Sequence, residues 1–198
     1  MEPLTRLDAV AVPLPRANVD TDQIVPALYL QKPRACDFGE FLFRDVRHDA
    51  QGARRPDFPL NQPAYEGARI LVAGRNFGCG SSREHAVWAL HDGGFRAVIA
   101  PSFGDIFFGN ALKNGLLPVR LADDIVDALL GALQRTPGVH LEVDLVQQTV
   151  VAPDGHSAAF DIDPFARRCL LEGIDELAYT LTQTVRIEAF ERDRVSAA

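Results

Sequence analysis

From residue 69 onward, short apolar runs alternate with segments in which apolar residues recur every three or four positions. Short apolar runs are typical of buried strands, and the longer period is typical of amphipathic helices. The pattern predicts strands at 69–73, 96–100 and 116–119, and helices at 81–92, 102–114 and 122–135. Glycines at 93, 94 and 115 stand where helices commonly end. This alternation predicts a mixed α/β fold.

The N-terminal third of the chain has a weaker pattern. Residues 7–13 are predicted to form a strand, and the following segment 14–26, rich in Pro, Asn and Asp, a loop. Residues 27–47 contain only short apolar pieces. The polar, proline-rich segment 48–63 is predicted to be a mobile surface loop.

The C-terminal third is predicted to add antiparallel strands and closing helices. Alternation within 141–151 and the turn at 153–155 lead into a further strand at 157–161. Residues 163–182 are predicted to form one or two helices. With 198 residues, 47% of them hydrophobic, the whole chain 1–198 is expected to be a single domain with a substantial core.

Charge and hydropathy exclude several classes of partner. The net charge of −7 argues against nucleic acid and anionic membranes. No apolar run reaches the 18 or so residues of a membrane-spanning helix. The first residues lack the apolar core of a signal peptide. A cytoplasmic protein is therefore expected.

The most informative stretch is Gly-Cys-Gly-Ser-Ser-Arg-Glu-His-Ala at 78–86, between a predicted strand and a predicted helix. Ser81 and Glu84 fit a capping box, which predicts that the helix begins at Ser81. Gly78 and Gly80 would let the backbone approach a ligand. The helix N-terminus favours an anion, and Arg83 adds a cation that binds carboxylates in a bidentate manner. Together these features predict a carboxylate site.

A capping box with nearby glycines is, by itself, usually no more than a helix start. Arg83 changes this interpretation, because an arginine in the first turn is disfavoured by the helix dipole. A residue that opposes a local rule often has a function.

Three ordered motifs give the chain a family resemblance. They are the runs 18–26 and 76–86 and the stretch 101–107 with Asn110 and 115–118. The chain resembles the mobile C-terminal domain of the aconitase superfamily, and within it the small subunits of isopropylmalate dehydratases. The resemblance extends from about Val10 to Phe190. It implies a single swivelling β/β/α barrel-like domain.

The resemblance also implies an activity, that of a hydro-lyase that isomerises 2-isopropylmalate and 3-isopropylmalate through 2-isopropylmaleate, a step of leucine biosynthesis. The small hydroxy-dicarboxylate substrate would lose a proton to Ser81, a serine alkoxide. Ser82 would hydrogen-bond the substrate and Arg83 would hold a carboxylate. The chemistry of the residues alone does not separate Ser81 from Ser82.

Dehydration of this type requires a [4Fe–4S] cluster, which the resemblance assigns to a separate large subunit. The three cysteines of this chain, at 36, 79 and 169, do not have metal-ligand spacing, so no metal site is predicted here. Cys79 lies beside the predicted site, where a small residue of a tight turn is the favoured interpretation.

Other residues near the motifs are assigned supporting roles. His85, four residues after Ser81, is expected on the same helix face, most simply as a hydrogen-bonded structural histidine. Asp20 and Asp22 are expected to make turn and capping interactions that support the catalytic turn. Asp105 is expected to cap or line the start of the helix at 102–114.

The residues that would select the substrate are predicted in segment 29–39, with Leu28 beside it. Leu28 and Leu30 would face the isopropyl group, and Lys32 or Arg34 would contact the distal carboxylate. The stretch 35–38 departs from the Arg-Thr-Gly-Phe expected of isopropylmalate enzymes. A related subunit that acts on dimethylmalate, citramalate or another methylated malate therefore stays open, as does a non-catalytic module that keeps the fold alone.

Overall fold

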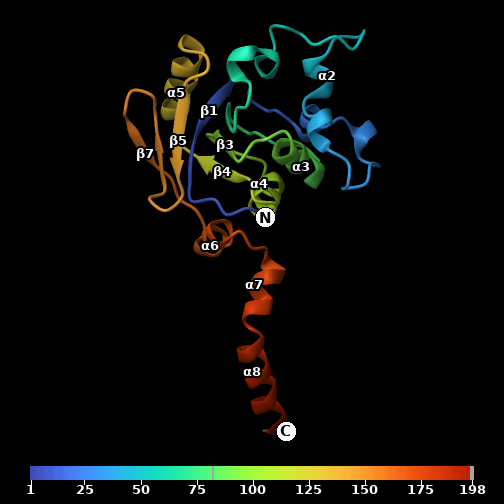
Figure 1. Ribbon diagram of the computed structural model, residues 1–198, viewed down its shortest axis with the longest axis vertical. Coiled ribbons are helices and arrows are strands. Elements are labelled where there is room, and N and C mark those ends of the chain that lie inside the picture. Colours follow the sequence, from blue (N-terminus) through green and yellow to red (C-terminus); the bar gives the residue numbers. More distant parts are fainter. Residues whose placement is uncertain (82, 197–198) are drawn as a thin grey trace.

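Seven strands form one curled sheet in the order β4-β3-β2-β1-β5-β6-β7 (Figure 1). The computed structural model describes residues 1–81 and 83–196, apart from the side chains at 193, 195 and 196. Four strands are parallel: β1 (Arg6–Leu14), β2 (Ile70–Ala73), β3 (Ala97–Ala100) and β4 (Leu117–Arg120). Three antiparallel strands continue from β1: β5 (His140–Asp144), β6 (Thr149–Val151) and β7 (Ser157–Ala159). The predicted mixed α/β fold is confirmed.

Helices cover both faces of the parallel strands, and β2 and β3 are buried at every position because their side chains alternate between the two covered faces. Leu71 and Val98 belong to the core under α3 (Glu84–Asp92) and α4 (Asp105–Lys113). Ile70 and Ala97, one residue earlier in each strand, belong to the core under α5 (Asp123–Arg135). Each face of the sheet is therefore closed by its own hydrophobic cluster.

Segment 15–69, between β1 and β2, contains short elements. They are α1 (Thr21–Ile24), η1 (Ala27–Tyr29), η2 (Phe38–Phe41), α2 (Arg44–Arg47), η3 (Pro59–Asn61) and η4 (Pro63–Tyr65). Part of the segment packs against α3, where Phe38 is fully buried. In the predicted mobile loop 48–63, Phe58 is buried and Asn61 Nδ2 donates to the carbonyls of Arg47 and Arg55. The mobility of this loop stays a prediction.

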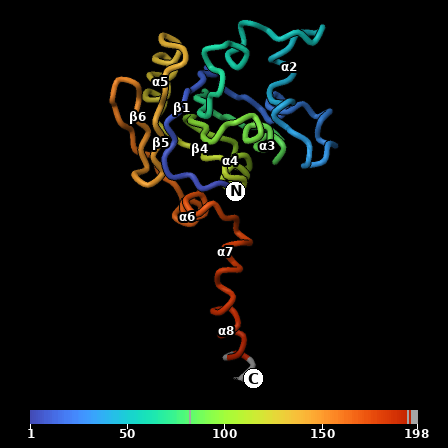
Figure 2. The backbone as a smooth tube through the Cα atoms, in the orientation of Figure 1, coloured from blue at the N-terminus to red at the C-terminus, as the bar shows by residue number. Residues whose placement is uncertain are grey.

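Three helices follow the sheet at the C-terminus: α6 (Pro164–Glu172), α7 (Glu176–Thr182) and α8 (Thr184–Ser196). The segment 163–182, predicted to form one or two helices, forms α6 and α7, whereas α8 was not predicted. Figure 2 shows α7 and α8 following one another away from the rest of the molecule. Among the residues that the structure describes, no helix is long and apolar enough to span a membrane.

Candidate active site

The candidate site lies where β1, β2 and β3 end, which is where parallel α/β sheets commonly bind ligands. The loops after these strands approach one another closely. Asn76 donates its backbone N–H to Ser102 Oγ (2.8 Å) and its side-chain amide to Asn18 Oδ1 (2.7 Å). Asn18 and Asn76 both have positive φ, 55° and 59°. Asparagine tolerates this conformation better than most residues, so these two asparagines turn and join the loops.

The turn at 78–81 is held from the side by Thr21, a buried residue that the sequence analysis did not single out. Thr21 donates its backbone N–H to the Cys79 carbonyl (3.0 Å) and its hydroxyl to the Ser81 carbonyl (2.8 Å). Gly78 and Gly80 have φ values of +70° and +90°. Both are left-handed conformations that favour glycine. The hydrogen bonds from Thr21 and the two left-handed glycines therefore hold residues 78–81 in a tight turn.

The predicted start of the helix at Ser81 is wrong. Helix α3 begins at Glu84, and its N-cap is Arg83, with no side-chain capping bond. The Glu84 carboxylate accepts instead from Asn114 Nδ2 (2.8 Å). The carbonyls of Cys79 and Ser81 accept from Thr21 in a turn that comes before the helix. Ser81 and His85 consequently do not share a helix face.

The helix end that faces the site belongs to α4. Gly104 is its N-cap, and the first intrahelical bond runs from the N–H of Phe108 to the Gly104 carbonyl (2.9 Å). The first N–H groups of a helix lack helical partners and carry the positive end of its dipole. Asp105 is the first residue of α4, after the cap rather than at it.

Ser81 and Arg83 share a cavity of about 240 Å³ with this end of α4. The other lining residues are Thr21, Gly78, Gly80, Gly104, Asp105, Ile106 and Phe107. Ser81 is exposed, and Arg83 is mostly covered, with 17% of its side chain accessible. The cavity thus combines a hydroxyl, a guanidinium and a helix N-terminus. Ser82 lies outside the described residues.

Two glycines set the distance between the turn and α4. A Cβ on Gly104 would lie 2.5 Å from the Gly78 carbonyl oxygen, and a Cβ on Gly78 would overlap the ring of Phe107. The backbone at Gly78, which was predicted to approach a ligand, therefore approaches Phe107 and the start of α4.

Gly104→Ala is expected to lower the free energy of unfolding by about 1–3 kcal/mol, because the added methyl meets backbone rather than a flexible side chain. Gly109→Ala is the matched control on the same helix, since a Cβ there meets no atom within 4 Å. That control should be neutral or stabilise by roughly 0.5–1 kcal/mol. Urea denaturation of both variants measures the difference. Equal stability of the two variants would show that the contact between Gly104 and Gly78 is loose.

The two aspartates of the first motif have different roles. The Asp20 carboxylate accepts from the Gln23 N–H (2.7 Å) and caps α1, as predicted. Asp22 was also predicted to make turn and capping interactions, but its carboxylate pairs with the Arg83 guanidinium, and about half of its side chain is accessible. Arg83 therefore already holds one carboxylate, which comes from the protein itself.

His85 is part of an aromatic cluster. Its ring lies 4.6 Å from that of Trp88 and 5.5 Å from that of Phe38. Trp88 donates to Asn114 Oδ1 (3.1 Å), which links this cluster to the end of α4. These contacts favour a structural role for His85.

The predicted specificity residues do not line this cavity. Leu28 is 80% exposed, Lys32 is exposed and Leu30 is half-buried. Arg34 forms a bidentate ion pair with Asp92, at 2.9 and 3.0 Å, so its guanidinium is engaged elsewhere. The contacts of Leu28, Leu30 and Lys32 with a substrate stay predictions.

A metal site in the described residues would need a group of His, Cys, Asp or Glu side chains. No group of three His, Cys, Asp or Glu side chains suited to a metal occurs in ranges 1–81 and 83–196, as far as their side chains are described. Burial and the nearby Asp20 raise the pKa of the Cys79 thiol, and burial raises that of Cys169. Both shifts favour the protonated thiol.

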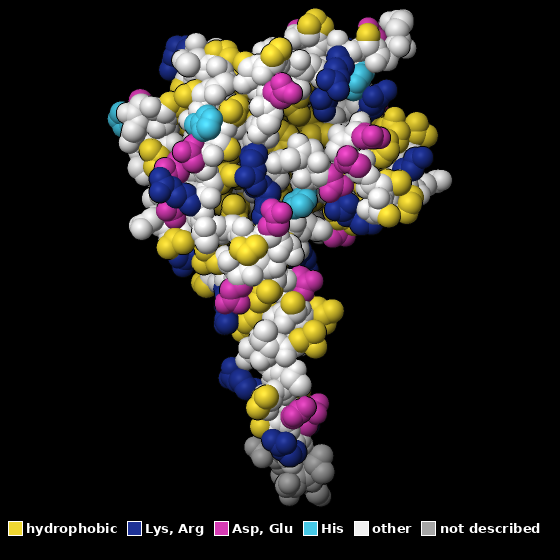
Figure 3. Space-filling view, in the orientation of Figure 1, with side chains coloured by type: hydrophobic (Ala, Val, Ile, Leu, Met, Phe, Trp, Pro, Cys, Tyr) yellow, Lys and Arg dark blue, Asp and Glu magenta, His cyan; other side chains and the backbone are white. Residues whose placement is uncertain are grey.

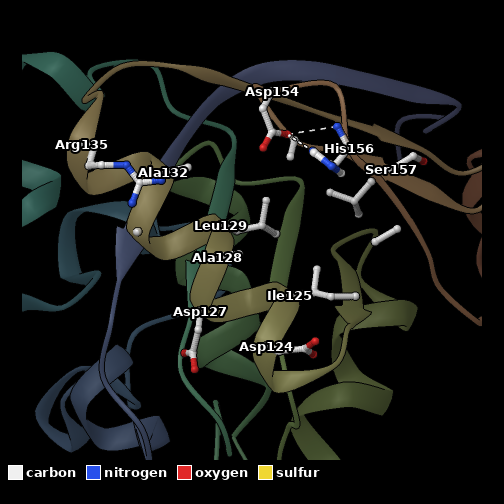
Figure 4. A pocket seen from close by; sticks show the side chains of 14 residues that line it. Asp124, Ile125, Asp127, Ala128, Leu129, Ala132, Arg135, Asp154, His156 and Ser157 are labelled. Carbon is white, nitrogen blue, oxygen red and sulfur yellow. Dashed lines mark hydrogen bonds and ion pairs between the residues drawn. The ribbon is translucent and has the colours of Figure 1, made fainter.

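A second, larger cavity lies on the other side of the sheet, between α5 and the β6–β7 hairpin. It has a volume of about 640 Å³ and an apolar floor that includes Leu129. Figure 4 shows His156 and Asp154 on the hairpin and Arg135 on α5. None of the predicted site residues lines this cavity.

Comparison with known proteins agrees with these observations. Residues 1–124 match the aconitase C-terminal domain family, and residues 127–164 match a model described as LeuD_N. The chain is 50% identical over 198 residues to the 3-isopropylmalate dehydratase small subunit of Paramagnetospirillum magneticum, covering 100% of this chain and 98% of the relative. It is 52% identical over 191 residues to that of Rhodospirillum centenum, covering 96% and 94%.

A solved structure shows the same fold. The 3-isopropylmalate dehydratase (leuD) of Methanocaldococcus jannaschii aligns with a TM-score of 0.66 and 28% sequence identity, over 94% of this chain and 99% of that one. The relatives are named small subunits, which implies a large subunit as partner. The chain belongs to the family of 3-isopropylmalate dehydratase small subunits, which has the aconitase C-terminal fold.

Proposed function

We propose that this chain carries the proton-abstracting half of an isopropylmalate dehydratase site, with Ser81 as the base and Arg83 as a carboxylate ligand. The observation that carries the proposal is the shared cavity, in which Ser81, Arg83 and the N-terminus of α4 line one space. The substrate is a small hydroxy-dicarboxylate, and this constellation suits such an anion.

Ser81 is a weak base unless its alkoxide form is stabilised. The positive end of α4 and the Arg83 guanidinium both favour an anion at this position. The bond from Thr21 to the Ser81 carbonyl fixes the backbone of the serine and so limits the positions of its hydroxyl. A preorganised base of this kind lowers the barrier for proton transfer.

Arg83 is proposed to exchange its Asp22 partner for a carboxylate of the substrate. Asp22 is half-exposed, so it can leave the guanidinium without losing access to water. The largely covered Arg83 would then hold the substrate beside Ser81 through two parallel hydrogen bonds. The pair with Asp22 keeps the guanidinium oriented while the site is empty.

The proposed reaction removes water from one pair of carbons and adds it back in the opposite sense. Ser81 takes the proton from the carbon next to a carboxylate of 2-isopropylmalate, the hydroxyl leaves the adjacent carbon, and the double bond of 2-isopropylmaleate forms. The proton and the hydroxyl together make up the water that is lost. In the second half Ser81 returns the proton to the carbon that carried the hydroxyl, and the hydroxyl enters at the carbon that lost the proton, which gives 3-isopropylmalate. Ser82 is proposed to hydrogen-bond the substrate. The [4Fe–4S] cluster that such dehydration requires is proposed to reside in the large subunit.

Leu28 and Leu30 are proposed to contact the isopropyl group, and Lys32 the distal carboxylate, in the assembled enzyme. Burying the alkyl branch should favour it over hydrogen by about 1–3 kcal/mol. The test compares kcat/KM for 2-isopropylmalate, dimethylmalate, citramalate and citrate on the complex with the large subunit. Isopropylmalate should be preferred. A preference for a smaller methylated malate would assign another substrate, and preference for citrate would reject branched malates altogether.

A further inference from the structure

The C-terminal helices α7 and α8 form an arm, here defined as residues 176–196, that extends from the molecule (Figure 1). Its 20 helical residues span roughly 30 Å at the usual helical rise. Several large apolar side chains of the arm are exposed, and yellow side chains follow it in Figure 3. They are Leu177 (68% exposed), Leu181 (65%), Val185 (76%), Ile187 (40%) and Phe190 (61%).

One side of α7 is attached to the rest of the molecule. The Tyr179 ring packs edge-on against Phe165 of α6 at 4.8 Å, and Glu176 pairs with Lys113 at the end of α4 (3.6 Å). At 100° per residue, Leu177 and Leu181 lie on the opposite side of the helix from these two residues. The attachment therefore leaves the apolar side free.

The position of the arm separates it from the candidate site. Asp105 and Lys113 mark the two ends of α4, and Asp105 lines the site cavity, whereas Lys113 contacts the arm. A protein that contacted both the site and the arm would therefore hold this chain at two separate places.

The spacing of the apolar residues argues against pairing of two copies through the arm. A coiled-coil seam needs alternating spacings of three and four residues along one side. Leu177 and Leu181 of α7 are spaced by four, and on α8 Ile187 and Phe190 lie on a different side from Val185. Apolar residues on more than one side fit a groove that encloses a helix better than a single seam.

The surface area that two arms could bury also argues against pairing of two copies through the arm. An apolar side chain of this size covers about 60–120 Å² when it is buried. Two arms together would bury about 600–1,200 Å², at or below the lower limit of about 1,200 Å² for a stable standard interface. The large subunit, by contrast, is proposed to contact this chain around Ser81 as well, so the area buried by the arm would add to the area of that contact.

We propose that the arm docks into an apolar groove of the large subunit and tethers this chain to it, away from the catalytic contact. The inference rests on the proposed function, in which this chain completes a site with the large subunit. The arm would hold the two subunits together, and the residues around Ser81 would act at the substrate.

The test is the affinity for the large subunit of the full chain with Leu177→Gln, Leu181→Gln and Val185→Gln together. Calorimetric titration without substrate should show a Kd at least tenfold weaker than wild type, and kcat at saturating large subunit should stay within twofold. Val146→Gln is the matched control, since Val146 is 51% exposed and lies outside the arm. Circular dichroism checks that the variants keep their helices. A second variant, with Ile187→Gln and Phe190→Gln together, tests the apolar side chains of α8 in the same titration.

A Kd of both variants within twofold of wild type would overturn the docking inference while leaving the proposed function intact. Concentration-dependent dimerisation of the isolated chain, lost in the triple variant without any change in Kd, would assign the arm to a second copy instead. Absence of any binding between the wild-type chain and the large subunit would overturn the proposed function together with the docking inference.

Discussion

Ser81→Ala is expected to lower kcat of the assembled enzyme by roughly 100- to 10,000-fold, the usual contribution of a positioned general base. KM should change little, because the serine acts mainly in the transition state. The fold should not change, since Ser81 is exposed and its carbonyl still accepts the Thr21 hydroxyl. Steady-state rates of 2-isopropylmaleate formation, with the large subunit in excess, measure both constants.

Ser157→Ala is the matched control for this experiment. Ser157 is exposed on β7, lines the distant cavity beside α5 and is not among the residues around Ser81. Its substitution should leave both constants unchanged. Near-normal kcat of the Ser81→Ala enzyme would place the base on another group, and Ser82 would be the next residue to replace.

Arg83→Lys is expected to raise KM roughly 10- to 100-fold with a smaller effect on kcat. A lysine keeps the charge but loses the planar pair of donors, and a hydrogen bond to a charged group contributes about 1.5–3 kcal/mol. Arg83 is expected to bind the substrate carboxylate because its guanidinium lines the cavity and already binds the carboxylate of Asp22. Initial rates over a range of substrate concentrations separate the two constants.

Arg75→Lys provides the comparison, because Arg75 also pairs with an aspartate, Asp123 (2.6 Å), but does not line the cavity. It should leave KM within twofold of wild type. A large fall in kcat at constant KM in Arg83→Lys would contradict a role in ground-state carboxylate binding. It would assign the guanidinium to the transition state instead.

The strands and helices of the sheet were predictable because their periodicity reflects burial on one or two faces. The predicted strand at 69–73 and helix at 122–135 match β2 and α5 within a residue or so. Helix α8 was not predicted, because its apolar residues do not follow one side of a helix.

The start of α3 was predicted at the wrong residue for a different reason. The Ser-x-x-Glu spacing at 81–84 satisfies the local rule for a capping box, but a distant residue, Thr21, engages the carbonyls of the turn. Tertiary contacts of this kind override local propensity, and sequence spacing does not contain them.

The site itself was predictable in part. Ser81 and Arg83 were expected in one turn and Asp105 in a supporting position, and all three line one cavity together with Gly78 and Gly80. The role of α4 as the helix that points at the cavity could not be derived from spacing alone, because it depends on the contact between Gly78 and Gly104. Thr21, Asn18 and Asn76 lay within the quoted motifs, and the two asparagines before tight turns were the signal for positive φ.

The most direct measurement is the rate of 2-isopropylmaleate formation from 2-isopropylmalate by three samples: this chain alone, the large subunit alone, and the two mixed under anaerobic conditions. A shared site predicts turnover by the mixture only, with a rate that saturates as this chain is added to a fixed amount of large subunit. Turnover by the purified chain alone, or by the large subunit alone at the rate of the mixture, would contradict it.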